Sequence, residues 1–295
     1  MVKNAIGSTP LRREDRRLVV NVDYSERQSQ VGVALAAGRD RLFVMEWLEA
    51  TRETASASIG DYVGSVRDAI AQIGEPVHLV GDCQGGWLAA VVAALDPESV
   101  ASLTVGAAPI DFHAGAGPLL ENVALSAHLQ GASYRALVSA GGGLLRGEVM
   151  VGGFIALAVE DEVRKQLDLL LGLRDPEYVR RYAEFEDWFK WTQDIAGAFY
   201  LWIVEHLFEG NELVAGTLRV GDETVDLRRI TCPVNVLGGT RDHITPPAQA
   251  LALADHVGTP RERIRTELVN AGHLGLFMGR APLRDHWAPL FASLA

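Results

Sequence analysis

The chain has few cysteines and few positive charges for its size. Its 295 residues include only 2 cysteines, Cys83 and Cys232. This small number argues against a fold stabilised by several disulfide bonds and fits a reducing compartment. Acidic residues outnumber basic ones 38 to 27, giving a formal net charge of -11. Such a charge argues against nucleic acid or an anionic membrane as the main partner.

Long hydrophobic runs are also missing. The longest apolar stretches, near residues 87–95 and 150–159, are too short to cross a bilayer. Residues 1–17 are polar and rich in arginine, so they lack the apolar centre of a secretory signal. These absences predict a cytoplasmic protein without a membrane span.

What the chain does have is enough apolar material for a large core, since 48% of its residues are hydrophobic. In the first third, short apolar runs predict strands at 18–22, 41–45, 77–80 and 100–105. Helical patterns at 28–37, 58–73 and 88–95 lie between them, and Ser58 with Asp61 forms a capping box. Continuous apolar strands separated by helices indicate a mostly parallel sheet that is covered by helices on both faces.

The alternation stops near residue 106 and returns after residue 213. Residues 107–213 predict a helical cap insertion, with helices at 118–129 and 159–171 and three tryptophans, Trp188, Trp191 and Trp202. These aromatics fit either the core of that insertion or an apolar acyl tunnel. Strands at 233–237 and 264–269, with helices at 247–256 and 283–294, complete a core formed by 1–106 and 214–295.

The most informative motif is residues 81–86, GDCQGG, between the strand at 77–80 and the following helix. It has the G-x-S-x-G form of a nucleophile elbow, with Cys83 in place of serine. The glycines at 81 and 85 allow a strained turn, because side chains there would collide with the strand and helix. The turn aims the N–H groups of a helix N-terminus at the nucleophile, where they stabilise negative charge.

Two further residues follow the last two predicted strands. In α/β-hydrolases the nucleophile, acid and histidine occur in that chain order, and Asp242 and His273 occupy the expected strand ends. We therefore predict a Cys83–His273–Asp242 triad in an α/β-hydrolase fold. Asp111 is the alternative acid, one strand earlier, and the glycines at 272 and 275 suggest that His273 lies in a loop.

Backbone groups complete the predicted site. The N–H of Gln84 would supply half of an oxyanion hole, and the loop around Tyr24 would supply the other half. No pair of histidines has a metal-ligand pattern, and we expect neither a metal nor a cofactor.

These motifs resemble those of the polyhydroxyalkanoate synthases and the intracellular polyhydroxyalkanoate depolymerases. The GDCQGG box is similar to the synthases' G-x-C-x-G-G, and residues 241–246, RDHITP, resemble their acid loop. Residues 191–213 and 225–233 are similar to the stretch before that acid, and Gly272-His273 matches the catalytic histidine. The run at 271–279, and Gln84 after the cysteine, look more like the depolymerase branch.

The resemblance implies that Cys83 is acylated, with His273 as base and Asp242 as its partner. It implies an acyltransferase acting on hydroxyacyl thioesters or esters, or else a hydrolase of hydroxyalkanoate polyesters. A non-enzymatic, granule-associated relative is a third reading, against which the complete triad argues. The expected partner is a hydroxyacyl-CoA or a polyester at polymer granules, and a homodimer formed through the cap is left open.

Overall fold

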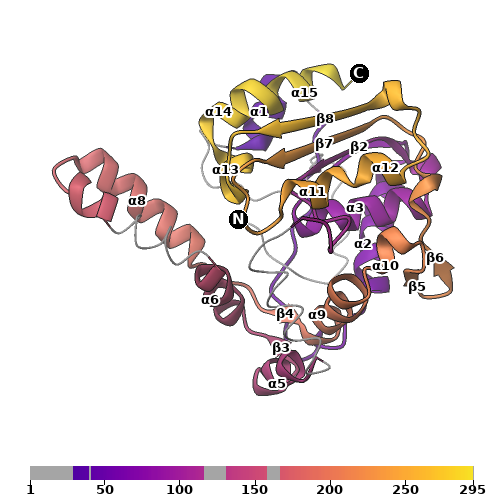
Figure 1. Ribbon diagram of the computed structural model, residues 1–295, viewed down its shortest axis with the longest axis horizontal. Coiled ribbons are helices and arrows are strands. Elements are labelled where there is room, and N and C mark those ends of the chain that lie inside the picture. Colours follow the sequence, from indigo (N-terminus) through magenta and orange to yellow (C-terminus); the bar gives the residue numbers. More distant parts are fainter. Residues whose placement is uncertain (1–28, 40, 116–130, 158–166, 295) are drawn as a thin grey trace.

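The protein is built around a four-stranded parallel sheet. The computed structural model describes residues 29–39, 41–115, 131–157 and 167–294. In this part of the chain the main sheet has the order β1-β2-β7-β8, and every neighbouring pair is parallel (Figure 1). The bounds of its strands are β1 Val77–Asp82, β2 Val100–Gly106, β7 Val234–Gly239 and β8 Ile264–Val269.

Alternate side chains of the strands enter two different hydrophobic clusters. Leu79 and Val236 belong to one cluster, whereas the next residues along their strands, Val80 and Leu237, belong to the other. This period of two is the signature of a sheet buried on both faces. The predicted site residues follow strands of this sheet, and parallel strands present all their carboxyl ends at one edge of the sheet.

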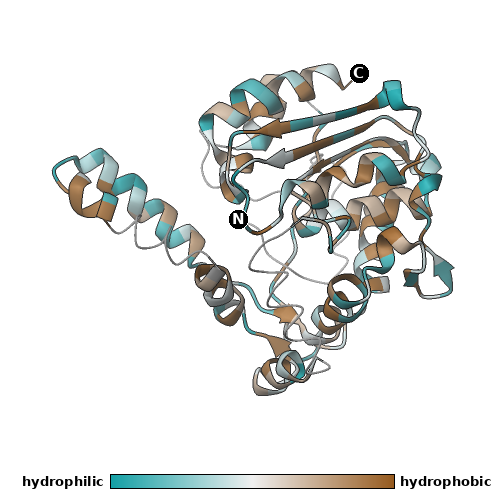
Figure 2. Ribbon diagram, in the orientation of Figure 1, coloured by the Kyte–Doolittle hydropathy of each residue, from teal (hydrophilic) through white to brown (hydrophobic). Residues whose placement is uncertain are grey.

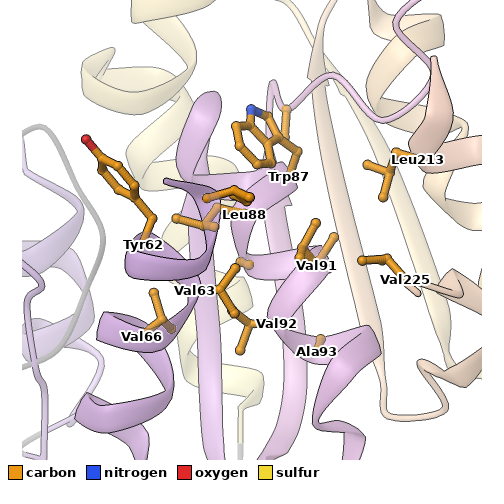
Figure 3. Close-up of a cluster of buried hydrophobic side chains, with 14 of the residues drawn as sticks. Tyr62, Val63, Val66, Trp87, Leu88, Val91, Val92, Ala93, Leu213 and Val225 are labelled. Atoms are coloured by element: carbon orange, nitrogen blue, oxygen red, sulfur yellow. The ribbon is translucent and has the colours of Figure 1, made fainter. Parts of the chain in front are cut away.

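Helices cover both faces of this sheet. One cluster is formed with α2 (Ile59–Ile73), α3 (Gln84–Leu95), α11 (Pro247–Leu251) and α12 (Leu253–His256). The other is formed with α1 (Gln30–Ala36), α13 (His273–Met278), the turn of π-helix η5 (Leu283–Trp287) and α15 (Ala288–Ser293). In Figure 3, side chains of α2 such as Tyr62 and Val63 meet those of α3, including Leu88.

Most predicted elements are present with small shifts. The predicted helix at 58–73 is α2, and its capping box forms, since the Ser58 N–H donates to Asp61 Oδ2 at 2.7 Å. The prediction of a strand at 41–45 is wrong: these residues form a single bridge, at Phe43, and do not join the regular sheet of the described residues. The predicted strand at 18–22 lies outside the described residues.

Between β2 and β7 the described chain is mainly helical. It contains α5 Ala132–Ala140, α6 Gly147–Leu157, α8 Pro176–Phe189, α9 Gly197–Trp202, π-helical η2 Ile203–Glu209 and α10 Glu212–Ala215. A two-stranded antiparallel ladder joins β3 (Leu144–Leu145) to β4 (Ile195–Ala196). The predicted helix at 118–129 lies outside the described residues, and of the one at 159–171 only 167–171 is described, as helix.

The chain between β3 and β4 extends away from the sheet, with α8 at its outer part (Figure 1). Asp194, just before β4, links the two ends of this segment. Its carboxylate accepts a hydrogen bond from the Gly147 N–H at 2.9 Å and forms an ion pair with Arg146 at 2.5 Å. In Figure 2 α3 is mostly hydrophobic, whereas α8 is largely hydrophilic and β8 is mixed. Smaller elements are β5 Arg219–Val220 and β6 Glu223–Thr224, which precede β7, and α14 Arg280–Pro282, which lies between α13 and η5.

Among the described helices, none combines the length and the apolar character that crossing a membrane requires.

Candidate active site

Cys83 lies in the sharp turn between β1 and α3. Its backbone has φ 49° and ψ -120°, a conformation that residues with side chains rarely adopt. The turn is held on both sides, because the Cys83 N–H donates to Gly106 O at 2.8 Å and its carbonyl accepts from the Gly86 N–H at 3.0 Å. The backbone strain at Cys83 is thus imposed by its surroundings.

Two glycines make this turn possible. A Cβ atom on Gly81 would lie 2.3 Å from the carbonyl oxygen of Gly85, and one on Gly86 would lie 2.3 Å from the Cβ of Ala108. Both distances are far below van der Waals contact, so the strand and the helix can approach each other only with glycine at these positions.

Asp242 and His273 meet at the carboxyl ends of β7 and β8. The Nδ1 atom of His273 lies 2.8 Å from Oδ2 of Asp242, and both residues are buried. The other oxygen of Asp242 accepts the N–H groups of Ile244 at 2.9 Å and Thr245 at 2.8 Å. The carboxylate therefore closes its own turn and orients the imidazole at the same time.

His273 is the first residue of α13, with Gly272 as its N-cap, and so the loop expected around it is a short helix instead. Its ring packs edge-on against Phe277, with centroids 5.4 Å apart. A buried helix start holds the ring in one orientation more firmly than a loop would, because both its backbone and its side chain are fixed by contacts.

The imidazole of His273 also forms a hydrogen bond with Cys83. Burial by itself lowers the pKa of His273, but the negative charge of Cys83 and the hydrogen bonds with Asp242 and Cys83 raise that pKa to about 10. With Nδ1 bound to Asp242, Nε2 is the ring nitrogen left for the sulfur. The raised pKa favours an imidazolium at His273 at neutral pH, directly beside the sulfur of Cys83.

The alternative acid, Asp111, lies in a different environment. Its Oδ1 accepts from Asn211 Nδ2 at 2.8 Å and from the His113 N–H at 3.0 Å. Asn211 also accepts the Phe112 N–H at 2.9 Å, so Asp111 joins the loop after β2 to the segment that follows η2. Of the two carboxylates, only Asp242 is hydrogen-bonded to His273 in the described residues.

One of the two predicted oxyanion donors, Gln84, lies at the start of a helix. Gln84 is the first residue of α3, so its N–H belongs to the free end of a helix directly after Cys83. Tyr24 lies outside the described residues. Within the described ranges, no group of three or more histidine, cysteine or acidic side chains could hold a metal ion.

A cavity of about 330 Å³ opens beside Cys83. Most of its wall is apolar and is shared between the sheet domain and the segment between β2 and β7. The polar side chains on its wall are Cys83, Gln84, Tyr134, Tyr200, Thr245 and Gln249. The apolar residues are Trp87, Pro109, Phe112, Leu137, Leu145, Val149, Met150, Gly153, Phe154, Ile195, Ile203, Val204, Phe208 and Ile244.

The tryptophans of residues 107–213, which fit either a core or an acyl tunnel by sequence, are not part of the wall of this cavity. Trp188, Trp191 and Trp202 do not border this cavity, and Trp191 is 60% exposed. Thr245 and Gln249 were missed, although Thr245 belongs to the RDHITP loop and its closeness to Asp242 could have indicated it. Tyr134 and Tyr200 carry no local signal that separates them from other aromatics of the helical segment.

A family model described as "Protein of unknown function (DUF3141)" matches residues 24–290. The chain belongs to that family. The match spans both halves of the sheet and all three residues that meet at the strand ends.

This DUF3141 protein is also a relative of polyhydroxyalkanoate polymerases. It is 27% identical to the poly(3-hydroxyalkanoate) polymerase subunit PhaC of Allochromatium vinosum over 264 residues, which are 87% of this chain and 71% of that protein. It is likewise 27% identical to PhaC of Synechocystis over 279 residues, 90% of this chain and 73% of that protein. The resemblance seen in the sequence motifs is confirmed.

Among solved structures, the monoacylglycerol lipase of Paleococcus ferrophilus superposes with a TM-score of 0.50 and 18% sequence identity. The match covers 81% of this chain and 76% of the lipase. Likeness at this level of identity concerns the fold alone. Together with the sheet order and the strand–turn–helix at Cys83, it confirms the predicted α/β-hydrolase fold.

Proposed function

We propose that this protein is an acyltransferase of the polyhydroxyalkanoate synthase type, which passes a hydroxyacyl group through a thioester on Cys83. One observation carries the proposal: the His273 imidazole is hydrogen-bonded to Asp242 on one side and to Cys83 on the other, beside an apolar cavity. The relatives named PhaC favour an acyl thioester as the donor substrate.

In the first half-reaction the Cys83 thiolate attacks the carbonyl carbon of the donor. The C–S bond to Cys83 forms, and the bond to the leaving thiol or alcohol breaks. His273 gives its proton to the departing group, and Asp242 keeps the ring in the required tautomer. The N–H of Gln84 supports the negative charge on the carbonyl oxygen while the tetrahedral intermediate exists.

In the second half-reaction the neutral His273 takes a proton from the acceptor. The acceptor oxygen attacks the acyl-Cys83 carbonyl, and the thiolate leaves. If the acceptor is the hydroxyl of another hydroxyacyl unit, the product is a longer ester. If the acceptor is water, the product is a free hydroxy acid, and the protein is a hydrolase of depolymerase type. The likeness of residues 271–279 and Gln84 to the depolymerase branch favours this second candidate.

Residues 107–213 are proposed to act as the cap of this site. The support is that the cavity wall beside Cys83 takes side chains from α5, α6, α9 and η2, all within that range. Such a wall holds the acyl chain in an apolar environment, which limits the access of water to the acyl-Cys83 thioester.

The test is to incubate the protein with 3-hydroxybutyryl-CoA and, separately, with amorphous polyester. Free CoA, free hydroxy acid and the mass of the intact protein are followed together. We expect CoA release and an acyl adduct on Cys83. Growth of oligomer indicates transfer to a hydroxyl, whereas free acid equal to the CoA released indicates hydrolysis.

Cys232→Ala is the matched control for Cys83→Ala. Burial raises the pKa of the Cys232 thiol, which makes it a poor nucleophile, so its loss should leave the rate unchanged. Cys83→Ala should abolish CoA release and the adduct. Absence of CoA release, adduct and polyester cleavage in the wild-type protein would overturn the proposed function.

A further inference from the structure

Two tyrosines stand out on the apolar wall of the cavity. Tyr134 on α5 and Tyr200 on α9 both border it, and their rings meet edge-on with centroids 5.9 Å apart. Both side chains are half-buried. Within the described ranges, neither hydroxyl has a hydrogen-bond partner in the protein. Neither hydroxyl is among the fully buried polar atoms without a partner in the described residues, so each is open to solvent or the cavity and available to a bound molecule.

The other polar side chains of the wall are already engaged or lie at the reacting end. The Gln249 amide donates to Phe112 O at 3.1 Å, and the Thr245 N–H is bound to Asp242. Cys83 and Gln84 belong to the elbow itself. The two tyrosine hydroxyls are therefore polar groups of the cavity wall distinct from the elbow and the acid loop, and two helices of the proposed cap contribute them.

The chemistry of the pair fits a hydroxyl ligand. Burial, with a contribution from the nearby Tyr134, raises the pKa of Tyr200 well above its usual range, so this phenol stays neutral. A neutral phenol can both donate and accept a hydrogen bond, which suits an alcohol better than a carboxylate. A phenylalanine would fill the same space without offering either.

We propose that Tyr134 and Tyr200 together bind a hydroxyl group carried by the acyl chain, so that the site selects hydroxyacyl groups over plain alkanoyl groups. This inference rests on the proposed function, because it supposes that the acyl chain occupies the cavity beside Cys83. A plain acyl chain would leave both phenols without partners in an apolar wall. Sites of this kind reject analogues that lack the hydroxyl.

The test uses three thioesters of the thiol N-acetylcysteamine, whose acyl groups are hexanoyl, 3-hydroxyhexanoyl and 6-hydroxyhexanoyl. Thiol release and the mass of acyl-Cys83 are measured for the wild-type protein, Tyr134→Phe, Tyr200→Phe and the double variant. We expect the wild-type protein to prefer one of the hydroxylated thioesters by about tenfold or more in kcat/KM. Each single variant should reduce that ratio severalfold by slowing the hydroxylated substrate, with hexanoyl transfer little changed.

Tyr62→Phe is the matched control. Tyr62 stacks on Phe199 at 3.8 Å, next in sequence to Tyr200, and burial followed by the charge of Asp61 raises its pKa to about 12. It does not border the cavity, so removing its hydroxyl should leave the ratio unchanged. Equal rates for hydroxylated and plain thioesters in the wild-type protein would overturn the inference. So would an equal loss for both substrates in the variants, which indicates packing alone.

A binding measurement separates this inference from the reaction itself. Free 3-hydroxyhexanoate, 6-hydroxyhexanoate and hexanoate are titrated into Cys83→Ala protein, with the fluorescence of Trp87 on the cavity wall as the signal. Tighter binding of a hydroxylated acid, lost in Cys83→Ala/Tyr200→Phe, supports the pair even if no thioester acylates Cys83. That combination of results would overturn only the proposed function, and equal binding of all three acids would overturn the role of the pair.

Discussion

The Nδ1 atom of His273 and the Oδ2 atom of Asp242 lie 2.8 Å apart, although 31 positions separate the two residues in the chain. The remaining oxygen of Asp242 is occupied by two backbone N–H groups of its own turn. These two bonds hold the carboxylate in place. Because its Oδ2 binds Nδ1 of His273, Nε2 is the ring nitrogen that faces Cys83.

Asp242→Asn should keep the turn but lose the charge that orients and stabilises the imidazolium. Its amide oxygen can still accept the N–H of Thr245, while the amide nitrogen cannot accept the proton of Nδ1. We expect kcat for thioester cleavage to fall by about 10³–10⁴. Asp111→Asn is the matched control, because Asp111 binds Asn211 and not His273, and its effect should be small. Equal losses in the two variants would contradict the assignment of Asp242.

The two cysteines should differ in reactivity. The imidazole of His273 lies beside Cys83, whereas burial raises the pKa of the Cys232 thiol. Iodoacetamide at neutral pH should therefore modify Cys83 at least about tenfold faster than Cys232. Peptide mass spectrometry over a time course measures both rates in one sample. His273→Ala should slow the labelling of Cys83 and leave Cys232 unaffected, and faster labelling of Cys232 would refute the pairing.

The pKa of His273 predicts a specific dependence of stability on pH. Its pKa in the folded protein is about 10, above the value of 6.5 for an ordinary histidine. A group whose pKa rises on folding adds stability that is complete below pH 6.5 and is lost as the pH rises through about 10. The free energy of unfolding of the wild-type protein minus that of His273→Gln should therefore decrease across this window.

Urea unfolding at a series of pH values measures that difference, and NMR titration of the His273 ring gives the pKa directly. Cys83→Ala removes the charge that contributes most to raising the pKa, so the ring should then titrate at lower pH. A ring that titrates near 6.5 in the wild-type protein would show that the Cys83–His273 pair does not form.

Close packing at the elbow should make Gly81 intolerant of any side chain. The Cβ of Gly81→Ala would lie 2.3 Å from Gly85 O, so the strand or the helix has to move. We expect a loss of about 1–3 kcal/mol in the free energy of unfolding, with reduced activity. Gly64→Ala in α2 has nothing within 4 Å of its new Cβ and should be neutral or stabilising by up to about 1 kcal/mol. Denaturant unfolding of both variants makes the comparison.

Local patterns in the sequence were sufficient for most of the sheet and for the elbow. Apolar runs mark β1, β2 and β7, and the glycines around Cys83 mark the turn, because strand burial and turn strain depend on neighbours close in the chain. The strand expected at 41–45 was wrong as a regular element, since pairing depends on which other strands lie beside it.

The chain order of Cys83, Asp242 and His273, and the strand ends they follow, were determined by the sequence alone. The choice between Asp242 and Asp111 as the partner of His273 was decided only by the tertiary structure, because both carboxylates follow strands and only their positions in space differ. The same holds for the cavity wall. Tyr134 and Tyr200 come together from α5 and α9, and no local pattern records which face of each helix meets the other.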